Sequence, residues 1–194
     1  MRKLTYFVAS TIDGFIAGPD GADPSGPDGF FLNEGDHMEA IFTDYPDIVP
    51  VHVREALGIS PDNIVFDTVL EGRRSYELGL EAGIPNAYPH LRHYVFSRSM
   101  TASPDPGVEL VSDDPVSKVR ELKQQHGLRI WLCGGAQLAR SLRPEIDELI
   151  VKLHPVVLGS GIPLFGGAFD PQRFELAESH IYASSVAFLT YVRP

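Results

Sequence analysis

The chain has 194 residues, of which 43% are hydrophobic and 22% are charged; these fractions are typical of a folded globular protein and exclude a disordered one. Its 26 acidic and 16 basic residues give a net charge of −10, which repels phosphate backbones and anionic lipids. We therefore expect no nucleic-acid partner and no membrane partner. The single cysteine, Cys133, excludes an internal disulfide and a multi-cysteine metal site. We expect a cytoplasmic protein without a bound metal, since a lone cysteine fits a reducing compartment.

The predicted elements begin with a buried strand at Lys3–Ala9, which is apolar on both faces. Residues 18–29 combine glycines, prolines and aspartates, so they predict a loop, and long ordered loops tend to be functional. Helices are predicted at 37–43, 53–57, 72–81, 115–126 (capped by Asp114) and 136–142. Strands are predicted at 63–70, 92–97, 108–111, 129–133, 146–157, 173–180 and 184–192.

Strands alternate with helices along the chain until the last two strands, which form a hairpin. This order predicts a single α/β domain over residues 1–194, with a mostly parallel central sheet and an antiparallel C-terminal hairpin. The hairpin at 173–192 carries many apolar side chains, and an apolar sheet edge is normally covered. We therefore expect a homodimer.

Two junctions between a strand and a helix carry the pattern of a phosphate site. Gly72-Arg73-Arg74-Ser75 places two cations at a helix start, where the helix dipole disfavours them and a bound anion would compensate. Gly134-Gly135-Ala136-Gln137 has the same architecture without the cations. Either junction alone could be a tight turn, with solvated arginines at the first. Two of them in one parallel sheet favour a phosphate-rich ligand beyond the carboxyl ends of the strands.

Several common motifs are missing. The sequence has no Walker A motif, no complete dinucleotide fingerprint after Gly159-Ser160-Gly161 and no serine-hydrolase elbow. His90 and His93 stand three residues apart beside Pro89, and we interpret them as surface residues rather than metal ligands.

The order of five segments resembles the dihydrofolate reductase superfamily, in particular the branch similar to the reductase domain of the bifunctional riboflavin-biosynthesis deaminase–reductase. The segments that carry this resemblance are Ser10–Ala17, Asp67–Glu77, Val95–Arg98, Cys133–Ala136 and His154–Phe165. The resemblance implies a three-layer domain of this fold and an NADPH site.

The resemblance also implies roles in binding NADPH. Arg73, with Arg74, would pair with the ribose 2′-phosphate, and Ser97 and Arg98 would complete that pocket. The pyrophosphate would lie between two sets of residues: Gly72 and Ser75 on one side, and Gly134, Gly135, Ala136 and Gln137 on the other. Backbone groups of Ala9 and Ile16 match the positions that hold the nicotinamide carboxamide.

The catalytic residues are predicted less directly. Folate reductases carry a carboxylate on the first helix, preceded by a tryptophan, whereas the one tryptophan here, Trp131, lies elsewhere and argues against folate. Asp36 precedes the first predicted helix, and Asp13 lies in a matched segment; both are catalytic candidates, although Asp13 could equally be a turn former.

We expect reduction of a C=N or C=O bond in a small polar or heterocyclic molecule, pyrimidine- or pterin-like, such as 5-amino-6-(5-phosphoribosylamino)uracil. One alternative is an NADP-binding protein of the same fold without turnover, and another is an α/β domain that binds no nucleotide.

Overall fold

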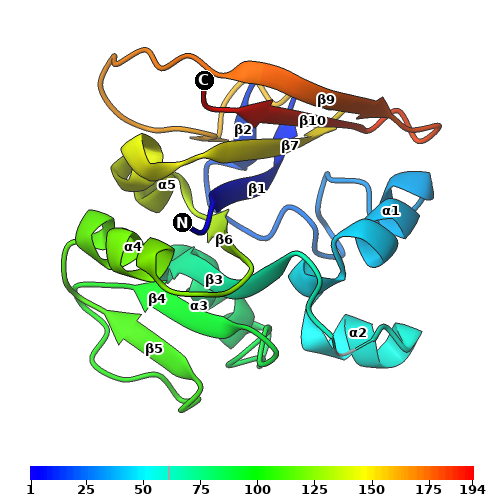
Figure 1. Cartoon of the computed structure of the whole chain (residues 1–194). Coiled ribbons are helices and arrows are strands. Elements are labelled where there is room, and N and C mark those ends of the chain that lie inside the picture. The colour runs from blue at the N-terminus through cyan, green and yellow to red at the C-terminus, as the bar shows by residue number, and fades with distance from the viewer. Residues whose placement is uncertain (61) are drawn as a thin grey trace.

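An eight-stranded sheet runs through the part of the chain that the structure, a computed structural model, describes: residues 1–60 and 62–194 (Figure 1). Its strand order is β5-β4-β3-β6-β1-β7-β10-β9. The strands are β1 (Leu4–Thr11), β3 (Phe66–Gly72), β4 (Arg92–Phe96), β5 (Val108–Val111), β6 (Arg129–Gly134), β7 (Glu148–His154), β9 (Glu175–Ile181) and β10 (Ala187–Val192). From β5 across to β7 in this order, each strand is parallel to its neighbour, whereas β10 pairs antiparallel with both β7 and β9. The predicted fold class is confirmed.

Helices cover both faces of the sheet, as Figure 1 shows, and this makes three layers. They are α1 (Asp36–Asp44), α2 (Val51–Leu57), α3 (Arg73–Glu81), α4 (Pro115–Gln124) and α5 (Ala136–Leu142), with short 3-10 turns at Pro46–Ile48 and Arg143–Glu145. Ile41 of α1 packs with Phe7 and Ile150 of the sheet, so we call this side the α1 face. Leu122 of α4 and Leu142 of α5 pack on the opposite face.

Strand β1 lies between β6 and β7 in the middle of the sheet, which explains its apolar sequence. The strand predicted at Lys3–Ala9 is confirmed and continues to Thr11. Every residue of β1 is buried except Ala9, which is half-buried. Ala9 is therefore the one residue of β1 that keeps partial exposure to solvent.

Several predicted boundaries differ from the structure for physical reasons. The strand predicted at 63–70 is Phe66–Gly72, because the Asp47 carboxylate accepts the amides of Ile64, Val65 and Phe66 before the ladder begins. The strand predicted at 146–157 is Glu148–His154 and ends before Pro155, which cannot donate to a ladder. Asp114 does cap α4, accepting the Ser117 amide at 2.9 Å, but that helix ends at Gln124 rather than 126.

A short antiparallel pair was not predicted: β2 (Phe15–Ala17) joins β8 (Ile162–Pro163). Strands of three and two residues are too short to show a period in the sequence. The pair holds the segments after β1 and β7 together. Residues 18–29 contain no helix or strand, as predicted.

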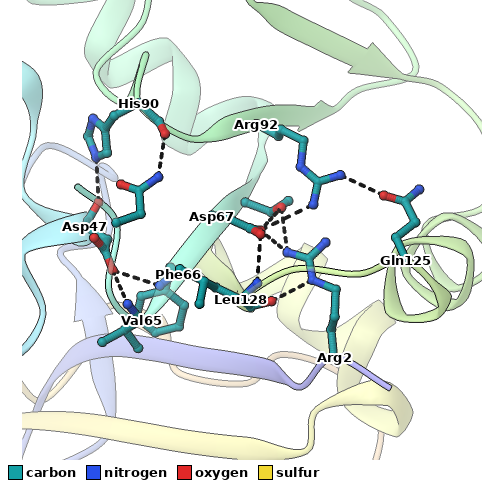
Figure 2. A network of polar contacts seen from close by, with 11 residues as sticks. Arg2, Asp47, Val65, Phe66, Asp67, His90, Arg92, Gln125 and Leu128 are labelled. Atoms are coloured by element: carbon teal, nitrogen blue, oxygen red, sulfur yellow. Dashed lines mark hydrogen bonds and ion pairs between the residues drawn. The ribbon is translucent and has the colours of Figure 1, made fainter. Parts of the chain in front are cut away.

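Ion pairs and hydrogen bonds connect the elements at the amino-terminal edge of the parallel strands (Figure 2), beside a cavity of about 340 Å³ that Arg2 and Leu128 help to line. The Arg2 guanidinium pairs with Asp67, and its Nε donates to the Leu128 carbonyl at 2.6 Å. Arg92 lies 3.3 Å from the same Asp67 carboxylate and donates to Gln125 at 2.7 Å. The polar side chains at this edge therefore bind mainly to one another.

The expectation that His93 is a surface residue is wrong. Its ring is 2% exposed, and its two nitrogens lie 2.7 Å from a Glu71 carboxylate oxygen and 3.0 Å from the Asn86 side-chain oxygen. The pattern around Pro89 suggested a turn, but His93 already belongs to β4 and points toward the Tyr76 ring of α3. His90 is only half-buried and bonds to the Asp47 carbonyl at 2.8 Å.

The outer edge strand β9 is exposed at every position. Its apolar side chains Leu176 and Ile181 are 56% and 79% exposed. The homodimer expected from this hairpin stays a prediction.

Candidate active site

The carboxyl ends of the parallel strands bring the five matched segments to one edge of the sheet. Strand β3 ends at Gly72, β4 is followed by Ser97, β6 ends at Gly134, β1 ends at Thr11 and β7 ends at His154. Parallel strands end on the same side, and ligands of open α/β sheets bind beyond these ends. We call this region the carboxyl edge.

The two glycine junctions adjoin each other at the carboxyl edge. A methyl group on Gly72 would lie 3.4 Å from the Gly135 nitrogen, and one on Gly135 would lie 3.4 Å from Ser75 Oγ. Neither α3 nor α5 has a side-chain cap on its first amides. The first amides of both helices therefore have no side-chain acceptor, and the glycines themselves place no Cβ atom between the junctions, where Leu138 Cβ is the nearest side-chain atom to Gly72. Gln137 is exposed beside them.

Arg73 and Arg74 are already partly compensated by their own helix. Arg73 lies 3.2 Å from Glu77, and Arg74 lies 3.8 Å from Glu77 and 3.7 Å from Glu81. Both arginines and Glu81 are largely exposed, and Glu77 is half-buried, so these pairs are weak. Two cations at this helix start therefore do not by themselves require a bound anion, because Glu77 and Glu81 already offset part of their charge. The arginines remain accessible, with side chains 51% and 56% exposed.

Ser97 and Arg98 follow β4, which lies beside β3 in the sheet. Ser97 is buried, and its hydroxyl accepts the amides of Ser99 and Met100 at 3.3 and 3.0 Å. This hydroxyl shapes the turn that presents Arg98. Arg98 itself is exposed and forms no ion pair within the described residues, so its charge is available to a ligand.

The loop at 18–29 packs against the other side of the carboxyl edge. Together with Leu158 and Ser160 it lines a cavity of about 340 Å³. The Arg74 guanidinium donates to the Asp20 carbonyl at 3.5 Å, which connects the loop to the start of α3. Ile16 of β2 packs against the core next to this region.

The Asp13 carboxylate binds the loop that follows β7. It accepts the Thr11 hydroxyl at 2.6 Å, the Leu158 amide at 3.1 Å and the Gly159 amide at 2.7 Å. The hydrogen bond from Thr11 is the main contribution that lowers the pKa of Asp13, and the two amides add to it. Asp13 therefore favours the ionised state and holds two loops together.

Asp36 has a comparable role at the start of α1. Its carboxylate accepts the Ala183 amide at 2.7 Å and the Ser184 amide at 3.1 Å, both in the turn between β9 and β10. Burial opposes ionisation, but these backbone hydrogen bonds outweigh it and lower the pKa of Asp36. The two predicted carboxylates, one after β1 and one at the start of α1, thus bind different loops and share no hydrogen-bond partner.

Sequence reasoning missed a basic cluster on the α1 face of the carboxyl edge, formed by His37, Lys152 and His154. The His37 and His154 rings are fully buried and meet edge to face, with centroids 5.9 Å apart. Burial, with the charge of Lys152 as a smaller contribution, lowers the pKa of His154 to about 3. Burial lowers the pKa of Lys152 to about 8. The strand alternation in β7 places Lys152 and His154 on one face, but no sequence signal placed α1 over them.

A mostly parallel sheet between two helical layers, with glycine junctions at its carboxyl edge, defines a dihydrofolate reductase-like α/β domain. Within this class the chain belongs to the family of the RibD C-terminal domain, whose family model matches residues 64–188. The matched region contains both glycine junctions and strand β7.

Two curated relatives span the whole chain. YwjB, an uncharacterised protein of Bacillus subtilis (strain 168), is 31% identical and aligns with 99% of this chain and 98% of its own length. YyaP, an uncharacterised protein of the same organism, is 27% identical and aligns with 98% of this chain and 94% of its own length.

Two solved structures share the fold. A Shewanella sp. PV-4 protein assigned to riboflavin biosynthesis superposes with a TM-score of 0.71 at 22% identity, covering 100% of this chain and 99% of that one. A diaminohydroxyphosphoribosylaminopyrimidine deaminase/5-amino-6-(5-phosphoribosylamino)uracil reductase from Thermotoga maritima gives a TM-score of 0.65 at 16% identity. The match covers all of this chain but 57% of the Thermotoga chain. At these identities the likeness concerns the fold alone.

Proposed function

We propose that this protein is an NADPH-dependent reductase that acts on a small polar heterocycle. The observation that carries this proposal is the meeting of Gly72 with Gly134-Gly135 at the carboxyl edge, with the accessible Arg73 beside them. Family membership and the reductase named for the Thermotoga neighbour support the reaction class. The same neighbour is the source of the pyrimidine-like substrate class.

The residues present fit a dinucleotide. Side chains at Gly72 or Gly135 would occupy the narrow space between the two junctions, where a pyrophosphate needs direct access to backbone amides. Ser75 lies against Gly135 and adds a hydroxyl to the same space. We propose that Gly134, Gly135, Ala136 and Gln137 bind the second side of the pyrophosphate.

Selectivity for NADPH over NADH would come from cations near the ribose. Arg73 and Arg98 follow adjacent strands and are both exposed, so they can approach one 2′-phosphate together. Arg74 pairs with Glu81 and donates to the Asp20 carbonyl of the loop, so it would contribute less to binding the 2′-phosphate. When bound, the cofactor supplies the hydride. Ala9 and Ile16 would hold its nicotinamide end through their backbone groups.

Calorimetry with NADPH and NADH tests the proposal. We expect the wild-type protein to bind NADPH at least about ten-fold more tightly than NADH, since one charge-assisted contact contributes about 1.5–3 kcal/mol. Arg73→Ala and Arg98→Ala should each remove most of this preference. Arg120→Ala, which alters an exposed arginine paired with Glu145, is the matched control and should keep it. Equal affinity for the two cofactors in the wild type would contradict the proposal.

One observation favours the alternative of a protein that binds NADPH without turnover. Both candidate carboxylates, Asp13 and Asp36, are held by backbone amides and have lowered pKa values, so neither is poised to donate a proton near neutral pH. NADPH oxidation with a panel of pyrimidines and pterins separates the two functions. If Asp13→Asn or Asp36→Asn abolishes turnover, that residue takes part in catalysis. If neither variant changes turnover, the two carboxylates only hold the loops in place.

A further inference from the structure

The basic cluster lies directly beside the strand position proposed to hold the nicotinamide. Ala9 of β1 pairs in register with Lys152 of β7, and Thr11 pairs with His154. Paired residues of neighbouring strands point to the same face, which here is the α1 face. On that face of β1 and β7, Ala9 and Lys152 are half-buried, whereas the residues two positions away on the same face are buried. Leu153 is also half-buried but packs on the opposite face. Ala9 and Lys152 are therefore the partly exposed positions on this face of the two strands.

His154 has a buried donor without an acceptor. Its Nδ1 accepts the Leu32 amide at 3.2 Å, so the neutral ring carries its proton on Nε2. Nε2 is buried and has no hydrogen-bond partner among the described residues. Its neighbour His37 is satisfied on both sides, by the Ser184 hydroxyl at 2.9 Å and the Leu32 carbonyl at 3.1 Å. An unpaired N–H of this kind is costly unless a ligand or water accepts it.

Lys152 has an ammonium without a counterion. In a chain with 26 acidic residues, it forms no ion pair or hydrogen bond in the described parts. The charged and titratable groups around it are His37 from α1 and His154 from its own strand, and both are basic. On the neighbouring β10 its register partner is Phe188. The carboxylates of α1 and β7, such as Asp36 and Glu148, form no ion pair with Lys152 in the described parts of the chain.

From this arrangement we propose that Lys152 and His154 bind an anionic oxygen of the substrate, such as a carboxylate or an ionised imide of a planar ring. Lys152 supplies the positive charge and His154 Nε2 supplies a directed hydrogen bond. The Phe31 ring, stacked on His154 with centroids 4.4 Å apart, fixes the imidazole plane. The inference rests on the proposed function for the identity of the ligand as a substrate, and it restricts that substrate to an acidic one.

Binding of two matched pyrimidines to the full chain without cofactor tests the inference. Orotate carries a carboxylate and uracil does not. We expect the wild-type protein to bind orotate at least about ten-fold more tightly than uracil, measured by calorimetry or by ligand-observed NMR. Lys152→Met keeps the apolar stem and should abolish the difference, whereas Lys152→Arg should retain part of it. His154→Asn keeps an acceptor for the Leu32 amide and should weaken orotate binding about five-fold or more.

Lys118→Met is the matched control, because Lys118 is a lysine paired with Glu109 on the opposite face. It should bind both pyrimidines as the wild type does. Equal binding of orotate and uracil by the wild type, no binding of either at about 10 mM, or an unchanged preference in Lys152→Met would overturn the inference. NADPH is absent from this experiment, so its outcome is independent of the calorimetric test of the proposed function.

Discussion

The two edges of the parallel sheet differ in how far their polar groups are paired, although Arg2 Nη1 and Asn63 Oδ1 at the amino edge also lack a hydrogen-bond partner among the described residues. At the amino edge, Arg2, Asp67 and Arg92 bind one another, and the buried Asp47 carboxylate accepts three successive backbone amides (Figure 2). At the carboxyl edge, the glycine junctions leave amides uncapped, and Lys152 and His154 Nε2 lack partners among the described residues.

From this difference we infer that the paired residues of the amino edge stabilise the fold, whereas the unpaired groups of the carboxyl edge are available to bind a ligand. A satisfied network contributes to the free energy of unfolding, whereas an unpaired buried donor or cation reduces it. Binding sites commonly retain such unfavourable groups. The contrast therefore predicts that substitutions at the two edges change stability in opposite directions.

The largest effect is expected for Asp47→Ala at the amino edge. It leaves the amides of Ile64, Val65 and Phe66 without their acceptor, which should lower the free energy of unfolding by about 3–5 kcal/mol. Urea denaturation measures this loss. Asp47→Asn keeps one acceptor oxygen and should lose about half as much. A loss below about 1 kcal/mol in Asp47→Ala would show that this edge is not a stabilising network.

Lys152→Met at the carboxyl edge should instead stabilise the protein. Burial lowers the pKa of Lys152, so the folded state holds its proton less tightly than the unfolded state does. The ammonium therefore opposes folding at neutral pH, and this cost disappears as the pH rises from about 8 towards the unfolded value. We expect a gain of about 1–2 kcal/mol at pH 7, less than the full pKa shift implies because the ammonium keeps partial hydration. A destabilised variant would mean that Lys152 has a structural partner.

A smaller effect concerns pH. Burial lowers the pKa of His154 to about 3 in the folded state and also lowers the pKa values of His37 and His90, so the unfolded state binds more protons below about pH 6.5. Stability should therefore fall as the pH drops from 6.5 towards 5.5, by up to about 1 kcal/mol for each histidine. This window lies above the carboxylate range, which isolates the histidines. In His154→Asn the decrease should be smaller than in the wild type, because His37 and His90 still contribute to it. An unchanged decrease would contradict the burial of a neutral His154.

The smallest energetic effect is expected at the exposed edge strand. If β9 joins a second copy, replacing the exposed Ile181 by lysine should weaken the homodimer while leaving the fold intact, because the side chain is 79% exposed. Sedimentation at micromolar concentration measures the change. A wild-type species of 21.3 kDa would remove the basis for a dimer.

The sequence predicted the sheet, the order of elements and the two junctions because these depend on local patterns. Gly72 and Gly135 follow apolar strands, and parallel strands necessarily end together. The basic cluster could not be predicted in this way. Its members come from α1 and β7, 115 residues apart between His37 and Lys152, and only tertiary packing brings them together. In contrast, the ion pairs of Arg73 and Arg74 with Glu77 could have been predicted from the sequence, since Glu77 stands at the i+4 and i+3 spacing from them.

Hydrogen–deuterium exchange of the full chain with and without NADPH tests the contrast between the edges most directly. We predict protection of the amides at 72–75, 97–98 and 134–137, with unchanged exchange at Val65 and Phe66 on the amino edge. Protection confined to the amino edge, or no protection at saturating NADPH, would contradict the assignment of the carboxyl edge as the cofactor site.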